Sequence, residues 1–382
     1  MCTKNTISDR FKLRRDYSFL PENSDNLILK GDNVLVLKEL CGTHKESIKC
    51  VYIDPPYNNG ESYYYYTDRN KHNIWAENIT KVLEHIKELL RNDGSLWISI
   101  NDVELPYLRI IADTVFGYNN FLATVIWQQR TSRENRTAFS VNHEYILVYA
   151  KDANSFKEVR NLLPLPSDFI SKRYKNPDND PRGMWQSVTA NVQDGHAVPS
   201  QYYTIISPSG VKHDPPKGRC WIYNKEKMDE EIKKNNIWFG LDGKGVPRVK
   251  KFLSERKVKG LNPETIWLSD IVGTTDSAKK HLKKLFPNNR IFETPKPEDL
   301  IKHIFDIATN ENDIILDCYL GSGSTVTTAH KMNRKYIGIE IGEHIIDLVS
   351  ERLKMVIGGE IGGISTKVAW KGGGDFALYE YK

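Results

Sequence analysis

The sequence has few cysteines and no long apolar run. Its 5 cysteines among 382 residues are scattered without paired spacing, which argues against a disulfide framework or a zinc site and fits a reducing cytoplasm. The N-terminal segment is polar and lacks the apolar core of a signal peptide, and no stretch approaches membrane-spanning length. We therefore expect a cytoplasmic protein with no membrane partner and no metal site.

Charge of one sign is also not in great excess. The chain carries 54 Lys and Arg against 49 Asp and Glu, a net charge of +5. This balance is compatible with a polyanionic partner but is weak evidence for one. The hydrophobic content of 39% is ordinary for a globular protein, and the length allows about two domains.

The most informative segment is Val51–Tyr57. Its β-branched and aromatic start predicts a buried strand, which the two prolines end because proline donates no ladder hydrogen bond. Asp54 then lies at the carboxyl end of a strand, where open α/β sheets bind ligands. Asp54, Pro55 and Pro56 offer acceptors, and Tyr57 offers a flat ring. Together they predict a pocket for an amino group on a planar base, whereas the alternative is a strand followed by a plain proline turn.

The same three letters occur again at Asp214-Pro215-Pro216, followed by Lys217. The residues before this copy do not form an apolar strand, and no aromatic residue follows it. We interpret it as a turn.

A glycine-rich turn follows a second predicted strand, Ile314–Asp317, and precedes a helix near 325–331. Its glycines, Gly321 and Gly323, let backbone approach a ligand closely at a helix N-terminus. The Gly-Lys-Ser/Thr of a phosphate-binding loop is absent, and Val326 stands where a dinucleotide fingerprint has Gly or Ala. Val326 weakens the dinucleotide interpretation without excluding it, and a nucleoside ligand without phosphates, such as S-adenosylmethionine, is the third interpretation.

Two further acidic residues end predicted strands. Glu340 closes the strand 336–340 and follows Asp317 at close to the ~20-residue spacing at which an acid binds ribose hydroxyls. Asp32 ends the predicted strand and turn over 27–32 and precedes a helix over 34–40. The alternatives are a solvated strand end for Glu340 and a helix N-terminal acid for Asp32.

The segment Asp54-Pro55-Pro56-Tyr57 resembles the signature of S-adenosylmethionine-dependent amino-methyltransferases that act on adenine N6. With Asn58-Asn59-Gly60 added, it is similar to the β-class enzymes and to the Mod subunits of type III restriction-modification systems. The resemblance implies methyl transfer from S-adenosyl-L-methionine to a flipped adenine in double-stranded DNA, with S-adenosyl-L-homocysteine as product and no metal required. It makes Asp54, Pro55, Pro56 and Tyr57 the catalytic residues.

The resemblance extends to the cofactor site. Cys318 and Leu320 depart from the family pattern around the glycines, and Lys296 lies in a Thr-Pro-Lys-Pro element that flanks the methionine end of the cofactor in the family. The residues so implied in cofactor binding are Asp32, Asp54, Lys296, Asp317, Tyr319, Gly321, Ser322, Gly323 and Glu340.

The order of these pieces is that of a circularly permuted chain. The cofactor unit near 314–340 comes last, although it would come first in an ordinary doubly wound sheet. We expect an α/β, Rossmann-like methyltransferase sheet with an inserted target-recognition domain. The expected divisions are a catalytic part at 20–150, a target-recognition region at 151–287, a cofactor-binding part at 288–356 and a tail at 357–382. Within the first part, a helix over 74–91 is expected to end at Asp93 and Gly94.

Two basic segments are candidates for DNA contact, although a charge run is often a solvated surface. One is the polar loop 128–136, which leaves the catalytic sheet. The other lies in the inserted region, where basic residues recur from Lys244 to Lys257 and Lys259. The candidate residues are Arg130, Arg133, Arg136, Arg248, Lys250 and Lys251.

Other functions stay open at this point. An RNA adenine methyltransferase would use a similar pocket, and cytosine-N4 enzymes usually carry Ser where Asp54 stands. A catalytically silent DNA-binding subunit is a third alternative. The resemblance also implies a homodimer and a possible restriction (Res) subunit as partner.

Overall fold

The computed structural model describes residues 7–22, 24–65, 68–69, 71–165, 167–256, 260–288 and 291–382. The chain divides into two compact units. The large unit comprises Met1–Asn161 and Pro263–Lys382, and the small unit comprises Leu162–Asn262. The small unit is thus narrower than the expected region 151–287, whose role in target recognition stays a prediction.

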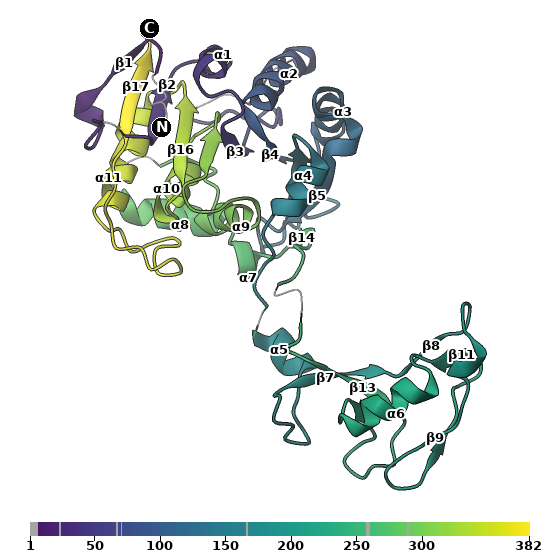
Figure 1. The fold of residues 1–382 in the computed structure, drawn as a ribbon. Helices are drawn as coiled ribbons and strands as arrows, with labels where there is room; N and C mark the ends of the chain where they lie inside the picture. Colours follow the sequence, from purple (N-terminus) through teal and green to yellow (C-terminus); the bar gives the residue numbers. More distant parts are fainter. Residues whose placement is uncertain are drawn as a thin grey trace. The chain divides into compact units, whose positions relative to one another are not determined.

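The large unit is built on one mixed sheet (Figure 1). From one edge to the other its strands are β1 (Phe11–Leu13), β17 (Ala377–Tyr381), β2 (Leu27–Lys30), β16 (Lys335–Glu340), β15 (Ile314–Asp317), β3 (Ile48–Ile53), β4 (Leu90–Ile100), β6 (Glu144–Ala150), β5 (Phe121–Trp127) and β14 (Ile266–Trp267).

The strand order confirms the predicted circular permutation. β15 and β16 come late in the chain, yet they lie between β2 and β3, and all of these neighbours are parallel. β4 continues the parallel run beside β3, whereas β6 is antiparallel to both β4 and β5. Reading β15 and β16 before β2 gives one doubly wound sheet, with the carboxyl ends of its central strands at one edge.

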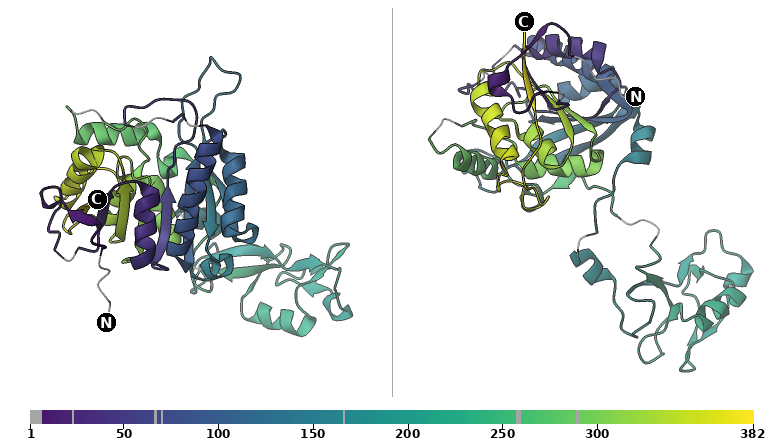
Figure 2. Two further views of the ribbon diagram at one scale, coloured as in Figure 1. Left: turned by 90° about the horizontal axis from the view of Figure 1, so that it is seen from above. Right: turned by 60° about the vertical axis from the view of Figure 1, so that its left-hand side comes forward.

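Helices cover both faces of this sheet (Figures 1 and 2). One face carries α1 (Asn33–Thr43), α2 (His72–Leu89) and α3 (Leu105–Phe116). The other carries α8 (Thr275–Leu285), α9 (Glu298–Ala308), α10 (Ser324–Lys331) and α11 (Glu351–Ile357). Shorter segments are α4 (Ala153–Val159), α7 (Ser269–Val272), the 3-10 turns Arg15–Tyr17 and Tyr118–Asn120, and the π-helical Ile345–Ser350.

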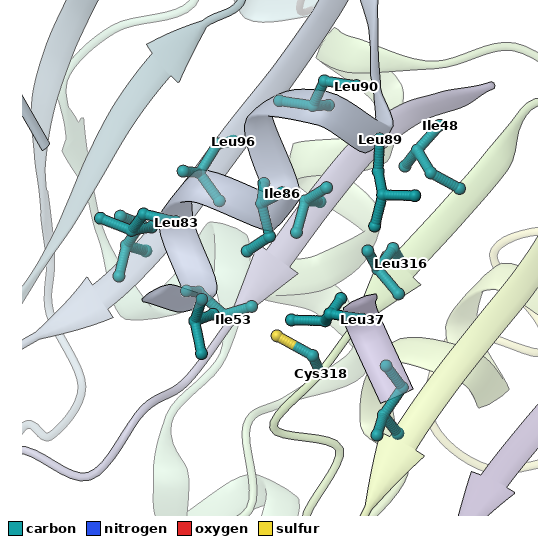
Figure 3. Packing of buried hydrophobic residues seen from close by; sticks show 14 of the residues in the cluster. Leu37, Ile48, Ile53, Leu83, Ile86, Leu89, Leu90, Leu96, Leu316 and Cys318 are labelled. Atoms are coloured by element: carbon teal, nitrogen blue, oxygen red, sulfur yellow. The ribbon is translucent and has the colours of Figure 1, made fainter. Parts of the chain in front are cut away.

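The core forms where apolar helix stripes meet the sheet. α2 buries Ile79, Val82, Leu83, Ile86 and Leu89, which recur at helical spacing. Figure 3 shows Leu83, Ile86 and Leu89 beside residues of β3 and β4 such as Ile53 and Leu96. The packed sheet therefore supports the strand ends rigidly.

The predicted end of α2 was wrong. The helix ends at Leu89, and β4 begins at Leu90, so Asp93 and Gly94 belong to the strand. A Cβ at Gly94 would lie 3.0 Å from the carbonyl oxygen of Ile48 on the neighbouring strand. The glycine permits this close approach and does not cap the helix.

The small unit has its own core. Trp221, Met228, Ile237, Phe239 and Val249 are buried together. Its antiparallel pieces are β12 (Ile237–Trp238), β13 (Arg248–Phe252) and β7 (Trp185–Thr189) in one sheet, β8 (Asn191–Gln193) with β11 (Arg219–Trp221), and β9 (Ile205–Ile206) with β10 (Lys212–His213). Its helical segments are α5 (Ser167–Arg173), α6 (Lys225–Lys233) and the 3-10 turn Pro199–Gln201.

None of the described helices combines the length and the apolar composition needed to cross a membrane.

Candidate active site

A cavity of about 740 Å³ opens at the carboxyl ends of the central strands of the large unit. Its walls include Asp32 after β2, Asp54 after β3, Asp317 at the end of β15 and Glu340 at the end of β16. Parallel strands bring these four acids, which are widely separated in sequence, to one edge of the sheet. This edge therefore brings together the two motifs that the sequence analysis singled out.

Asp54 is held from two sides. Its Oδ1 accepts a hydrogen bond from the Tyr57 hydroxyl at 2.9 Å, and its Oδ2 accepts one from Lys296 Nζ at 2.6 Å. The Pro56 carbonyl accepts from the Trp75 indole at 2.7 Å, which fixes the proline turn to α2. Pro55 also lines the cavity. The two prolines thus rigidify the loop that presents Asp54.

Lys296 lies in a cluster of opposite charge. Its ammonium is 3.6 Å from Glu144 Oε2 as well as bonded to Asp54, and 8% of its side chain is exposed. Burial works against the charged ammonium, but the Asp54 and Glu144 carboxyls outweigh it and raise the pKa of Lys296. Lys296 therefore lines the cavity as a cation bound to Asp54, and its predicted contact with the cofactor stays a prediction.

Glu144 was missed as a site residue by the sequence analysis. It begins β6, and its Oε2 lies 2.9 Å from the Tyr57 hydroxyl. Burial raises the pKa of Glu144, and the nearby Asp54 adds to this effect while Lys296 opposes it. The signal in the sequence was a carboxylate at the start of an otherwise apolar strand.

Asp68 is a second missed residue. Its buried carboxylate accepts backbone hydrogen bonds from Tyr57 at 3.1 Å and from Asn58 at 2.6 Å. Gly60 donates to the Asp68 carbonyl at 2.9 Å. Asp68 thereby holds the loop after β3 in place, a role that no local pattern reveals because the partners are about ten residues apart.

The glycine turn between β15 and α10 forms the opposite wall. Asp317 accepts from the Tyr319 backbone at 2.9 Å, and burial raises the pKa of Asp317 to about 7. Gly321 and Gly323 both have positive φ, at 49° and 76°, which favours glycine. Tyr319, Gly321 and Ser322 line the cavity, and Gly323 precedes α10.

Glu340 braces the glycine turn. Its Oε2 accepts from the Gly321 backbone at 2.9 Å, and its Oε1 accepts from the backbones of Ile341 and Gly342 at 3.0 and 2.9 Å. Asp32 has a similar local contact, because it caps α1 by accepting from Leu35 at 3.1 Å. Both acids line the cavity, and each carboxylate has further lone pairs that can accept from a ligand hydroxyl.

The basic loop after β5 reaches the cavity with Gln129, Arg130 and Ser132. Arg130 lines it, whereas Arg133 and Arg136 are exposed. Arg136 is paired with Glu134 at 3.0 Å. The contact of these three arginines with DNA stays a prediction.

The basic residues of strand β13 in the small unit lie in different environments. Lys251 is exposed, and Arg248 is partly buried and donates to the carbonyl of Ser187 at 3.2 Å. Lys250 is buried and bound to Asp178 and Asp180, so its ammonium is not open to a phosphate. The predicted DNA contact of Lys250 is therefore corrected to an internal ion pair. Lys257 and Lys259 lie outside the described residues.

No group of three or more histidine, cysteine or acidic side chains that could hold a metal ion occurs within the described ranges. A metal-independent reaction stays a prediction.

Comparison with known proteins identifies the family. The StyLTI Mod subunit, a type III restriction-modification protein of Salmonella typhimurium, is 30% identical over 82% of this chain and 51% of its own length. The probable HindVI Mod subunit of Haemophilus influenzae is 31% identical over 94% of this chain and 54% of its length. The type II methyltransferase M.KpnI of Klebsiella pneumoniae is 28% identical over 86% of this chain and 84% of its length.

The chain spans about half the length of the two Mod subunits that it matches. A family model described as DNA methylase, N6_N4_Mtase, matches residues 48–351, which is most of the chain. The match runs from β3 across the small unit to α11 and so includes the Asp54–Tyr57 loop and the glycine turn, whereas Asp32 lies before it. The chain belongs to the N6_N4_Mtase family of DNA methylases.

Proposed function

We propose that this protein transfers a methyl group from S-adenosyl-L-methionine to the N6 amino group of an adenine flipped out of double-stranded DNA. The observation that carries the proposal is the cavity shared by Asp54–Tyr57 and the glycine turn. One wall presents acceptors and an aromatic ring to an amino-bearing base, and the other presents backbone N–H groups and acids to a nucleoside. Its volume is within the range of small-molecule sites.

The residues of the first wall make N6, which is a weak nucleophile, more reactive. The amino lone pair is delocalised into the ring, and hydrogen bonds from N6–H to Asp54 and the Pro55 carbonyl localise it toward the methyl group. Tyr57 stacks on the flipped base, a contact worth about 1–3 kcal/mol. Holding the two reactants in line supplies up to ~7–11 kcal/mol of the barrier. The sulfonium is already an activated leaving group, so the step needs no metal.

The second wall holds the cofactor. Gly321, Ser322 and Gly323 bring backbone close to it, Glu340 and Asp32 accept from its hydroxyls, and Asp317 and Tyr319 complete the pocket. Arg130, Arg133, Arg136, Arg248 and Lys251 contact the DNA. The Mod relatives support a role within a restriction-modification system. The homodimer and the Res subunit as partners are part of the proposal.

Asp54→Ala tests the assignment. We expect methyl transfer to unmethylated genomic DNA to be lost, because N6 then has no carboxylate acceptor, while binding of S-adenosyl-L-methionine by calorimetry persists. Modification-sensitive sequencing of DNA treated with the wild-type protein should show N6-methyladenine in one short motif.

Asp214→Ala is the matched control. Asp214 begins the second Asp-Pro-Pro and accepts from the Thr204 hydroxyl in the small unit at 2.6 Å. This variant should keep methyl transfer. Full activity of a folded Asp54→Ala protein contradicts the catalytic assignment, and N4-methylcytosine in the sequencing contradicts the adenine target.

A further inference from the structure

The proposed transfer leaves one proton without a destination. When the N6 lone pair bonds to the methyl carbon, the carbon–sulfur bond breaks and its electron pair stays on sulfur as a thioether. The nitrogen would carry a positive charge if it kept both of its hydrogens. One of them must leave to a group in the cavity before neutral N6-methyladenine forms.

Asp54 is the first group that this proton can reach, and a hydrogen-bonded path leads onward from it. The Tyr57 hydroxyl is 2.9 Å from Asp54 Oδ1 and 2.9 Å from Glu144 Oε2. A hydroxyl has one hydrogen, so it donates to one of these carboxyls at a time and can accept from the other. It therefore bridges two carboxyls in the way that a proton relay requires.

The Lys296 cation gives the relay a direction. Its ammonium is 2.6 Å from Asp54 and 3.6 Å from Glu144. Because Coulomb attraction falls with distance, the negative charge is better placed on Asp54 and the proton on Glu144.

We infer that Glu144 is the final acceptor of the N6 proton, which reaches it from Asp54 through the Tyr57 hydroxyl. N6–H gives its proton to Asp54, Asp54 passes a proton to the Tyr57 oxygen, and Tyr57 gives its own hydrogen to Glu144. At the end Asp54 is again a carboxylate, Tyr57 is unchanged and Glu144 is a neutral acid. The proton leaves N6 as the methyl group arrives. This inference rests on the proposed function.

The groups around Glu144 fit this role. Those that influence its charge are Asp54 and Tyr57 from the loop after β3 and Lys296 from the segment before α9. On the adjacent strand β5 its cross-strand neighbour is Trp127, which is uncharged. Burial raises the pKa of Glu144, which makes it a better base than an exposed glutamate. Burial also raises the pKa of Tyr57, so its hydroxyl stays protonated.

Glu144→Gln tests the relay because glutamine keeps the shape and the bond to Tyr57 but cannot take the proton. The assay is single-turnover methyl transfer from labelled S-adenosyl-L-methionine to saturating unmethylated genomic DNA, measured across pH. The wild-type rate should rise with pH through the pKa of Glu144 and then level off, because the acceptor must be ionised. The variant should be slower by about 10²–10⁴-fold and should lose this rise, with cofactor affinity unchanged.

Two further variants sharpen the test. Tyr57→Phe keeps the ring but removes the bridging hydroxyl, so it should lose the same rise with pH. It also decides the question by itself if Glu144→Gln does not fold. Asp113→Asn is the matched control. Asp113 lies on α3, accepts a hydrogen bond from the Tyr149 hydroxyl at 2.7 Å and is not among the residues that line the cavity. It should match the wild type.

Wild-type rate and pH profile in a folded Glu144→Gln protein would overturn the inference and leave the proposed function standing. A merely positional role for Glu144 predicts this same result, because glutamine restores the hydrogen bond. Absence of methyl transfer by the wild-type protein at every pH would overturn the proposed function and the relay together.

Discussion

At the scale of single residues, the environment of a charged group decides what it does. Lys250 and Lys251 are adjacent on β13, yet Lys250 has 0% of its side chain exposed and pairs with Asp178 and Asp180, whereas Lys251 faces solvent. Lys250 also lies over the Trp185 and Trp238 rings. It therefore belongs to the core of the small unit.

Lys250→Met is expected to lower the free energy of unfolding of the small unit by about 3–5 kcal/mol, because it removes the buried cation that Asp178 and Asp180 share and leaves only Asp180 with a second cationic partner, Arg182. Lys251→Met, the exposed control, should change it by no more than about 0.5 kcal/mol. Urea unfolding of the full chain, followed by tryptophan fluorescence, measures both. Equal stability of the two variants would contradict the internal role of Lys250.

The pH dependence of this stability has a definite sign. Hydrogen bonds from Arg182 and then Lys250 hold the pKa of Asp180 below its ordinary value against the effect of burial. The stabilisation is therefore present above the unfolded-state pKa and is lost as the pH falls through the folded-state value. The comparison of the two lysine variants belongs near pH 7, where the pair is intact.

Much of the candidate site at residue scale could be predicted, but not all. Asp54 and the glycine turn are marked by local patterns, since each follows a short apolar run and ends it with turn-forming residues. The burial of Lys250 could not be predicted, because its carboxylate partners lie about 70 residues upstream. Glu144 escaped notice for the same reason, as its partner Tyr57 comes from another strand end.

At the scale of elements, the glycine turn is fixed by a buried ion pair behind it. Arg352 of α11 donates to the Ser322 carbonyl at 2.9 Å and to Glu298 of α9 at 2.9 Å. Lys331 of α10 donates to the same glutamate at 2.9 Å. Glu298 follows the segment that carries Lys296, so one network joins the two walls of the cavity.

Arg352→Met should lower stability by about 3–5 kcal/mol and weaken S-adenosyl-L-methionine binding, because Glu298 loses a cation and the turn loses a donor. Arg352→Lys should restore part of both. Arg334→Met is the control, since Arg334 donates to the Thr309 carbonyl at 3.1 Å, away from the turn. Calorimetric titration of the folded variants measures the effect, and wild-type affinity in Arg352→Met would show that the pair does not support the turn.

The central helices and strands were predictable because their apolar periodicity is strong, as in α2 and β3. Their boundaries were less so. Gly94 looked like a helix end, but the extended backbone starts at Leu90 and the glycine serves a close approach between strands. Such a close approach depends on the neighbouring strand β3, and the sequence around Gly94 does not show which strand lies beside it.

At the scale of the whole molecule, the sheet explains the tail at 357–382, for which the sequence analysis gave only bounds. β17 pairs in parallel with β2 and antiparallel with β1, so the tail ends as part of the sheet. Phe376, Ala377 and Leu378 are buried there. The circular order of the motifs predicted the centre of the sheet, but not this added edge, because a strand of only five residues carries no signal of its partner.

The small unit is joined to the large unit by two neighbouring crossings of the chain. Leu163 and Leu261 exchange backbone hydrogen bonds, both of 2.9 Å, so the two ends of the small unit meet. Its core is separate, and the cavity is lined by residues of the large unit. Replacing 162–262 by a short Gly-Ser linker should therefore leave the large unit folded.

The deleted protein is expected to bind S-adenosyl-L-methionine with the affinity of the full chain but to lose sequence-specific methylation, since the cofactor wall is intact and the proposed recognition region is gone. Calorimetry and modification-sensitive sequencing measure the two properties separately. The full chain carrying Lys251→Met serves as a control for a small loss of DNA contact. Methylation of the same motif at the same rate by the deleted protein would mean that recognition lies in the large unit, where the loop with Arg130 borders the cavity.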